Sequence, residues 1–302
     1  MTMRIFVTGA TGFIGSATVR ELLGAGHQVL GLVRSDEGAA ALAAMGAGVV
    51  RGSLDDLDAL RRGAEAADGV IHTAFIHDFT SFAESCAVDQ RAIAAIGEVL
   101  AGTSRPFAIT SGTPVEPGRA ATEADDAVRT NPVSALRAPA EDLTLALAGR
   151  GVRSCVVRMP RAVHGTSERG WQGGFAHLLL DLARRTGVSA FIGDGAQRWP
   201  AVHRLDAARL FRLAIEKAPA ASRLHAIGDE GVAMRELAAA IGRALGVPVA
   251  SKSGSDAEAH FGFLAGIGAL DQPASSAGTR ALLGWQPREI GLLADLEANV
   301  KG

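Results

Sequence analysis

The stretch Arg4-Ile-Phe-Val-Thr-Gly-Ala-Thr-Gly-Phe-Ile-Gly15 decides the fold of this chain. Its apolar run, residues 5–7, predicts a short buried strand, and residues 13–23 carry the pattern of a helix that ends near Gly24 and Gly26. Between the two lie three glycines at the spacing G-x-x-G-x-x-G. The stretch therefore predicts a strand, a tight turn and a helix.

The glycines of this turn, Gly9, Gly12 and Gly15, suit a phosphate-binding loop. A helix N-terminus favours an anion because its first N–H groups have no partner within the helix. Gly9 suits the tight turn, Gly12 lets a pyrophosphate approach the backbone, and Gly15 lets the helix pack closely on the strand. The flanking strand and helix strengthen a signal that would be weak alone in a chain with 37 glycines. A tight turn without a ligand is the alternative.

The segment from Thr8 to Gly15 resembles the fingerprint of the extended short-chain dehydrogenases/reductases, which include the NAD-dependent epimerases/dehydratases. The resemblance covers nearly the whole chain. It implies an α/β fold, a Rossmann doubly wound parallel sheet with a smaller C-terminal α/β substrate lobe. We expect residues 1–163 and 200–228 in the dinucleotide-binding domain, and 164–199 and 229–302 in the lobe. The turn residues that we expect to bind the cofactor are Gly9, Thr11, Gly12, Phe13, Ile14 and Gly15.

The composition indicates an ordinary globular protein: 302 residues, 48% hydrophobic and 21% charged, with a net charge of -2. Such a charge gives no field that would gather nucleic acid, so we expect no nucleic-acid partner. No apolar run is long enough for a membrane span, and the first strand begins too early for a signal peptide. Cys86 and Cys155 are expected to be reduced core thiols in a cytoplasmic protein. The histidines and cysteines show no metal-ligand spacing, so no metal is expected.

The end of the second predicted strand, residues 27–33, bears on the choice of cofactor. In a dinucleotide fold an acidic residue here binds the ribose 2′-hydroxyl of NAD, whereas a basic residue accommodates the 2′-phosphate of NADP. Arg34 and Ser35 stand at this point and favour NADP(H) over NAD(H). Asp36 supports the alternative, because a strand that ends one residue later places a carboxylate near the ribose.

Further cofactor contacts follow from the resemblance. It places Ser53 and Leu54 beside the adenine, although residues 53–56 also have the form of a helix-capping box. It also places Thr73 and Ala74, at the end of the fourth predicted strand, beside the cofactor diphosphate.

The segment from Arg158 to Gly165 resembles the family motif R-x-P-x-x-V-Y-G, whose loop holds the nicotinamide carboxamide. This assigns Pro160 and Val163 to the cofactor. His164 replaces the aromatic residue of the motif, and it is a candidate proton donor because histidine titrates near neutral pH.

The usual acid/base centre of the family, Y-x-x-x-K, is missing. The stretch Asn131-Pro-Val-Ser-Ala-Leu-Arg137 puts Val133 at the tyrosine position and Arg137 at the lysine position, and the chain contains no tyrosine at all. Valine gives no proton and arginine stays protonated. The chain is thus similar to the atypical subgroups of the superfamily. Arg137 is a candidate for the nicotinamide ribose, or a solvated helix residue, and Asp89 departs from the asparagine that is common in the family.

A catalytic serine or threonine is expected after the fifth predicted strand. The expected position falls on Gly112, so the flanking Ser111 and Thr113 are both candidates to polarise a substrate carbonyl. The residues that we expect around a substrate are His77, Trp171, Phe175 and Trp199. His77 and Asp78 form an acid/base pair or a surface pair. The aromatic residues, with Phe261 and Phe263, suggest an apolar substrate unless they belong to the core.

The leading hypothesis is an NADP(H)-dependent oxidoreductase that transfers a hydride to a small, mostly apolar carbonyl or related double bond. A catalytically inactive NADP(H)-binding sensor is the second, and it accounts directly for the missing tyrosine. The third is an imine reductase, because a protonated imine already carries the proton. By analogy with the superfamily we expect a homodimer through helices 82–102 and 134–148, which a monomeric sedimentation mass would refute.

Overall fold

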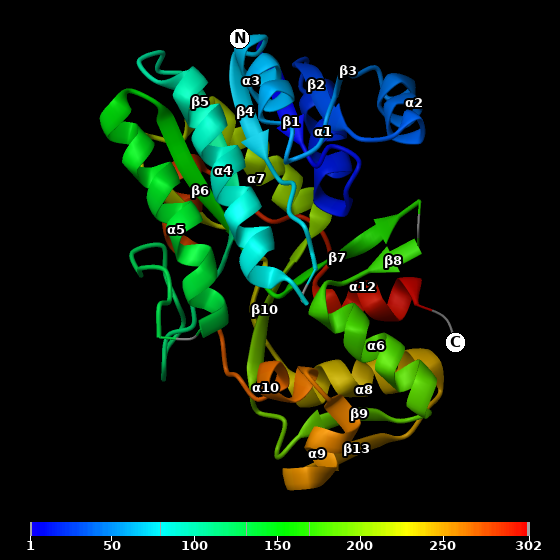
Figure 1. The fold of residues 1–302 in the computed structure, drawn as a ribbon. Coiled ribbons are helices and arrows are strands. Elements are labelled where there is room, and N and C mark those ends of the chain that lie inside the picture. Colours follow the sequence, from blue (N-terminus) through cyan, green and yellow to red (C-terminus); the bar gives the residue numbers. More distant parts are fainter. Residues whose placement is uncertain (1, 79, 131, 169, 301–302) are drawn as a thin grey trace.

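The computed structural model describes residues 2–78, 80–130, 132–168 and 170–300, with the backbone alone at 132 and 133. A seven-stranded sheet dominates the upper lobe in Figure 1. Its order is β11-β6-β5-β4-β1-β2-β3, and all of its paired strands are parallel. The strands are β1 (Arg4–Thr8), β2 (Gln28–Val33), β3 (Gly48–Arg51), β4 (Gly69–His72), β5 (Pro106–Gly112), β6 (Arg153–Met159) and β11 (Ser222–His225).

Helices cover both faces of this sheet. Helix α1 packs against α7 on one face, and α3, α4 and α5 pack in succession on the other. Within β1, Ile5 and Val7 join one apolar cluster and Phe6 joins the other, because successive side chains of a strand point to opposite faces. The helices are α1 (Phe13–Gly24), α2 (Asp36–Ala44), α3 (Leu57–Glu65), α4 (Phe82–Leu100), α5 (Pro132–Ala146), the 3-10 turn η1 (Leu147–Arg150), α7 (Arg204–Lys217) and α11 (Ala277–Leu283).

A second sheet, in the order β12-β10-β7-β8, begins the lower lobe (Figure 1). A two-stranded sheet and further helices complete it around a third apolar cluster. Its elements are β7 (Ala162–Ser167), β8 (Gly170–Gln172), α6 (Phe175–Thr186), β9 (Ser189–Ile192), β10 (Arg198–His203), β12 (Asp229–Ala233), α8 (Met234–Leu245), β13 (Val249–Lys252), α9 (Gly254–Phe261), α10 (Leu264–Gly268) and α12 (Leu292–Asn299). Strands β7 and β10 cross the boundaries predicted at residues 163 and 199.

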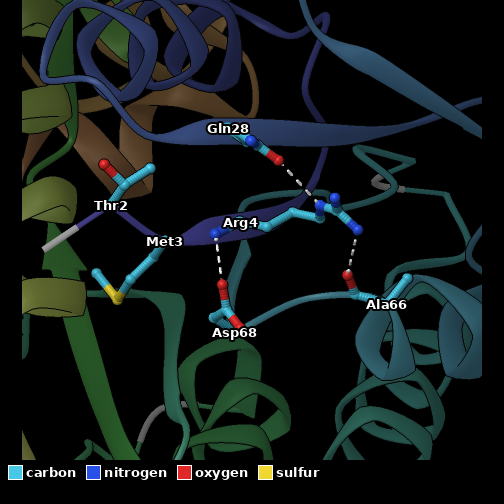
Figure 2. Close-up of a pocket in the computed structure, with 6 residues that line it drawn as sticks. All are labelled: Thr2, Met3, Arg4, Gln28, Ala66 and Asp68. Atoms are coloured by element: carbon cyan, nitrogen blue, oxygen red, sulfur yellow. Dashed lines mark hydrogen bonds between the residues drawn. The ribbon is translucent and has the colours of Figure 1, made fainter.

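The parallel sheet flanked by helices confirms the predicted Rossmann-like fold class. In such sheets ligands bind beyond the carboxyl ends of the strands. Figure 2 shows a hollow at the opposite edge, where Arg4 donates from its backbone to Asp68 at 2.7 Å. It is lined by Thr2, Met3, Arg4, Gln28, Ala66 and Asp68. Among the described helices, none is long and apolar enough to cross a membrane.

The caps of helices α3 and α7 are side chains that accept from a backbone N–H, and the cap of α3 differs from the sequence prediction. Helix α3 begins at Leu57, so its cap is Asp56, which accepts from the backbone N–H of Ala59 at 2.9 Å, and not Ser53. Helix α7 begins at Arg204, and the side chain of His203 caps it by accepting from the backbone N–H of Leu205. Asp206 lies inside the helix, buried, and accepts from backbone N–H groups of residues 288 and 289. It therefore fastens the C-terminal segment to α7.

Candidate functional site

The glycine turn folds tightly on its own backbone. Gly9 has a φ of +68°, and its carbonyl accepts from the N–H of Gly12 at 2.9 Å. A Cβ on Gly15 would lie 1.9 Å from that carbonyl oxygen, and a Cβ on Gly9 would lie 2.7 Å from the backbone nitrogen of Ala74. Gly12 stands at the cap position of α1 and offers no side chain to its first N–H groups. The turn and the open helix N-terminus therefore form a cradle that fits the pyrophosphate of a dinucleotide.

The end of β4 lies against this turn, as the resemblance implies. The hydroxyl of Thr73 donates to the carbonyl of Thr8 at 2.8 Å, and the backbone N–H of Ala74 donates to the Thr8 hydroxyl at 3.3 Å. Thr73 and Ala74 thus form one wall of the cradle.

The first turn of α1 also contacts the start of α7. Thr11 is exposed beside the glycines, and Ile14 packs on the sheet. The guanidinium of Arg204 lies 4.6 Å from the ring centroid of Phe13 and donates to the hydroxyl of Ser16 at 2.8 Å. Arg204 covers the Phe13 ring and ties α7 to the helix that carries the glycine turn.

The carboxyl end of β2 carries an unpaired positive charge. Arg34 is exposed, and it makes no hydrogen bond or ion pair within the described ranges. Ser35 caps α2 by accepting from the N–H of Gly38 at 3.1 Å, and Asp36 is ion-paired with Arg51 at the end of β3. The acidic side chain that argued for NAD is therefore already neutralised by a neighbour.

The segment predicted to touch adenine is partly occupied by other contacts. Leu54 is buried in an apolar cluster under the sheet, and the hydroxyl of Ser53 accepts from the backbone N–H of Asp55 at 3.3 Å. Any adenine contact would thus use the edge of this loop.

The two candidate hydroxyls after β5 differ in their surroundings. The Thr113 hydroxyl donates to the carbonyl of Met159 at 2.7 Å, so it is engaged in holding β5 to β6. Ser111 is nearly buried, and its hydroxyl has no hydrogen-bond partner among the described residues. A Cβ built on the intervening Gly112 would meet no described atom within 4 Å. Of the two hydroxyls, only that of Ser111 is therefore unengaged within the described residues.

Arg137 is held by a buried carboxylate. One terminal nitrogen of its guanidinium lies 2.8 Å from Asp89, and the other donates to the carbonyl of Thr110 at 3.1 Å. The guanidinium also stacks 4.2 Å from the ring centroid of Phe75. The two departures from the family pattern, at 89 and 137, are thus partners. Asn131 and the side chain of Val133 lie outside the described residues.

The Asp89 carboxylate is the first member of a buried series of hydrogen-bonded side chains. Its second oxygen lies 3.0 Å from Nε2 of His72, and Nδ1 of the same ring lies 2.8 Å from the hydroxyl of Thr8. These side chains are almost fully buried. This series of hydrogen bonds links α4 and α5 to the end of β1, directly before the glycine turn.

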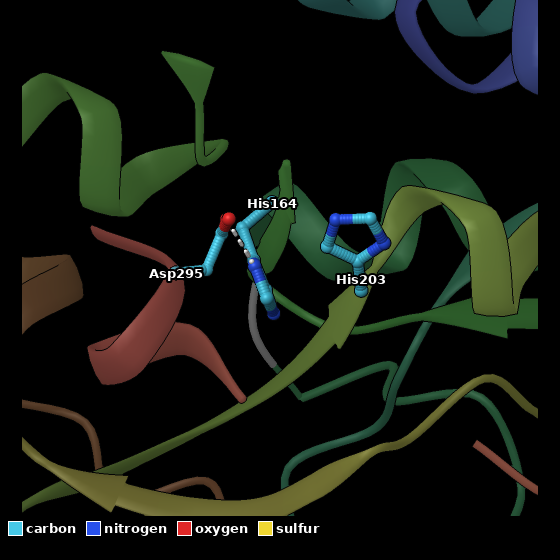
Figure 3. Close-up of side chains that lie close together, drawn as sticks. All are labelled: His164, His203 and Asp295. Carbon is cyan, nitrogen blue, oxygen red and sulfur yellow. Dashed lines mark hydrogen bonds and ion pairs between the residues drawn. The ribbon is translucent and has the colours of Figure 1, made fainter. Parts of the chain in front are cut away.

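His164 lies in a buried cluster between β7 and α12 (Figure 3). Its Nδ1 lies 2.8 Å from Asp295, which also accepts from Trp171 at 2.6 Å and from Asn299 at 2.9 Å. Burial acts to raise the pKa of Asp295, but the hydrogen bonds from His164 and Trp171 outweigh it and lower the pKa. The Nε2 of His164 is buried without a partner among the residues that the structure describes. This placement favours a structural role over proton donation to a substrate.

His164, His203 and Asp295 also offer ligand atoms within 4.8 Å of one another, a grouping that the sequence spacing did not predict. The carboxylate is already occupied by three donors, and Nδ1 of His203 accepts from the backbone N–H of Leu205 at 3.3 Å. The carboxylate and Nδ1 of His203 are thus occupied, whereas Nε2 of His164 has no partner among the described residues.

Three of the predicted substrate residues lie in the second lobe, where Phe175 and Trp199 have ring centroids 6.4 Å apart, whereas His77 lies beside Phe75. Trp199 is fully buried and Trp171 nearly so, both in the core of the second lobe, whereas Phe175 lies at its border. Phe261 belongs to the same core, and Phe263 is 67% exposed. These aromatic residues do not gather into one apolar pocket, because most of them stabilise the lobe itself.

His77 and Asp78 do not pair with each other. Asp78 accepts from the hydroxyl groups of Thr80 and Ser81, which hold its pKa at about 2. Desolvation and the nearby charge of Arg137 lower the pKa of His77. A neutral imidazole beside Phe75 is therefore the form expected at pH 7.

Sequence reasoning missed Arg161 and Gln272. The Nε of Arg161 donates to the side-chain oxygen of Gln272, whose amide donates in turn to the carbonyl of Thr113 at 2.7 Å. Arg161 stands with Arg158 in an otherwise apolar stretch from Val156 to Val163, and this was the available signal for it. Gln272 gave none, because it lies far away in the sequence.

Comparison with known proteins shows the family to which this chain belongs. The model of the NAD dependent epimerase/dehydratase family matches residues 5–227. An uncharacterized protein of Schizosaccharomyces pombe is 48% identical over 98% of this chain and 99% of its own. A 2-alkyl-3-oxoalkanoate reductase of Stenotrophomonas maltophilia is 31% identical over 83% of this chain and 78% of its own. The UDP-glucose 4-epimerase of Thermus thermophilus, solved with NAD, is 20% identical with a TM-score of 0.75, covering 99% and 98% of the two chains.

Proposed function

Because the chain belongs to the NAD dependent epimerase/dehydratase family, we propose that it is an NADP(H)-dependent oxidoreductase acting on a small carbonyl substrate. The observation that carries this proposal is the hydroxyl of Ser111, which has no hydrogen-bond partner among the described residues. Ser111 lies near the carboxyl end of β5, at the same edge of the sheet as the glycine turn after β1. A relative that is named as an oxoalkanoate reductase supports a carbonyl as the reacting group.

The roles of the residues follow from their contacts. When bound, NADPH supplies the hydride that the carbonyl carbon accepts. The hydroxyl of Ser111 donates a hydrogen bond to the carbonyl oxygen and polarises it. A proton from water completes the alcohol, since His164 is buried and His77 is largely neutral. Arg137 stabilises the packing of α5 on α4 and β5 through its contacts with Asp89 and Thr110.

The choice of NADP(H) rests on Arg34. Arg34 follows Val33, which pairs with Arg51 on the neighbouring strand, and Asp36 balances the charge of Arg51, so one exposed cation remains for a 2′-phosphate. An Arg34→Gln variant is expected to bind NADPH about tenfold more weakly and NADH unchanged, measured by fluorescence titration. Arg185→Gln, at an exposed arginine of the other lobe, is the control. Equal losses for the two cofactors would overturn the assignment.

Turnover tests the proposal directly. NADPH oxidation is followed with a panel of aldehydes, ketones, oxo acids, quinones and imines. Ser111→Ala is expected to lower kcat about 100-fold on the best substrate while NADPH affinity stays unchanged. Thr113→Val, which removes a hydroxyl already bonded to Met159, is expected to keep kcat within about threefold and to cost about 1 kcal/mol of stability. Full activity in Ser111→Ala would remove that residue from the mechanism.

A second candidate is an NADP(H) sensor without catalysis. It is favoured by the absence of tyrosine and by the engagement of Arg137 with Asp89, which together leave no conventional proton donor. Tight NADPH binding without turnover across the panel would establish it. Turnover of imines alone would instead identify an imine reductase.

A further inference from the structure

Arg161 is a desolvated cation without a carboxylate partner among the described residues. It follows Pro160 between β6 and β7, and its guanidinium carbon lies 5.9 Å from the ring centroids of both Phe175 and Trp199. No Asp or Glu of the described ranges forms an ion pair with it. Desolvation lowers its pKa to about 10, so it remains charged at neutral pH. A buried charge of this kind is costly unless an anion compensates it.

Two other arginines with a pKa lowered by desolvation give the contrast. Both terminal nitrogens of Arg153 donate to backbone carbonyls, and those of Arg204 donate to Thr166 and Ser16. Arg161 is fixed only through its Nε, by Gln272. Its two terminal nitrogens have no hydrogen-bond acceptor in the part of the chain that the structure describes, and neither is sealed in the interior. They are therefore open to a ligand.

The position of Arg161 connects it to the proposed reaction. Gln272, which fixes its Nε, also donates to the carbonyls of Thr113 at 2.7 Å and Pro114 at 3.3 Å. These residues follow directly after β5 and Ser111. The side-chain amide of Gln272 thus connects the guanidinium of Arg161 to the end of β5, the strand that carries Ser111.

We infer that Arg161 binds a carboxylate of the substrate, so that the reaction proposed above acts on an oxo acid. A planar guanidinium with both terminal nitrogens free matches a carboxylate through two parallel hydrogen bonds. A single cation beside two adjacent aromatic rings balances one negative charge, which favours a carboxylate over a phosphate dianion. This inference rests on the proposed function for the reaction, but the anion site can be tested without it.

The kinetic test uses 3-oxohexanoate and its uncharged methyl ester. Arg161→Gln is expected to lower kcat/KM for the acid about 10- to 100-fold and to change that for the ester less than about threefold. Arg161→Lys keeps the positive charge but not the two parallel N–H donors of the guanidinium. Its loss of kcat/KM for the acid is therefore expected to be smaller than that of Arg161→Gln. Arg243→Gln is the control, because Arg243 lies in the same lobe with a side chain 62% exposed and paired with Glu297. Unchanged NADPH binding shows that each variant is folded.

A binding test separates the anion site from the activity. Calorimetry compares unreactive hexanoate with hexanamide, on the NADPH-loaded wild-type protein and on Arg161→Gln. Hexanoate is expected to bind the wild type about tenfold more tightly than hexanamide, and the variant is expected to lose this preference. If that holds while no carbonyl compound is reduced, the anion site stands and the proposed function fails. If carbonyl compounds are reduced but Arg161→Gln treats acid and ester like the wild type, the inference is overturned and the function stands.

Discussion

A Gly15→Ala variant is expected to lose about 100-fold in NADPH affinity and about 3 kcal/mol in stability. The added Cβ would lie 1.9 Å from the carbonyl oxygen of Gly9, and backbone cannot yield as a flexible side chain does. The turn must therefore open, which moves both the Gly9 carbonyl and the N-terminus of α1 away from the phosphate position. Fluorescence titration with NADPH and urea unfolding measure the two effects.

Gly24→Ala is the matched control for this prediction. It lies at the other end of α1, where an added Cβ meets no described atom within 4 Å. Alanine is a better helix former than glycine, so this variant is expected to keep NADPH affinity and to change stability by less than about 1 kcal/mol. Wild-type NADPH binding by Gly15→Ala would show that close packing of the turn is not required.

The second large effect is expected at Arg137. Asp89 is 2% exposed, and its carboxylate is shared between Arg137 and His72. An Arg137→Ala variant leaves this carboxylate with a histidine alone, so we expect a loss of about 3 kcal/mol in the free energy of unfolding. Urea unfolding measures it. Arg129→Ala is the control, because Arg129 and Asp142 form a pair with side chains 56% and 52% exposed, so its loss of stability is expected to be far smaller.

A double-mutant cycle shows whether the two departures from the family pattern compensate each other. The variant Asp89→Asn with Arg137→Lys restores the residues that the family pattern has at these positions. Its loss of stability is expected to be smaller than the sum of the two single losses, because each single change already weakens the same charged pair. Strictly additive losses would show that the residues are energetically independent.

The sequence predicts those features that depend on local patterns. The apolar run of β1, the glycine spacing and the helix after it are neighbours along the chain, so their geometry follows from backbone preferences alone. The strand ends near Arg34, Thr73 and Ser111 could be placed for the same reason. Parallel topology then gathers these ends at one edge of the sheet.

Contacts between distant segments could not be predicted in this way. Asp89 and Arg137 were each recognisable as unusual, but only the packing of α4 on α5 makes them partners. Aromatic residues were ambiguous for a different reason. A pocket wall and a lobe core draw on the same side chains, and Trp199 is in the core. Arg161 became visible only once the structure showed which arginines have their donors occupied.

The position of β11 late in the sequence has a consequence for how this chain folds. Strand β11 pairs along the outer edge of β6, with Ser222 opposite Cys155, after the chain has passed through most of the second sheet. Any nascent chain or fragment that ends before residue 222 exposes that edge of β6, and unpaired strand edges promote association. Completion of the nucleotide-binding sheet is therefore tied, during synthesis, to the emergence of a segment that lies beyond most of the smaller sheet.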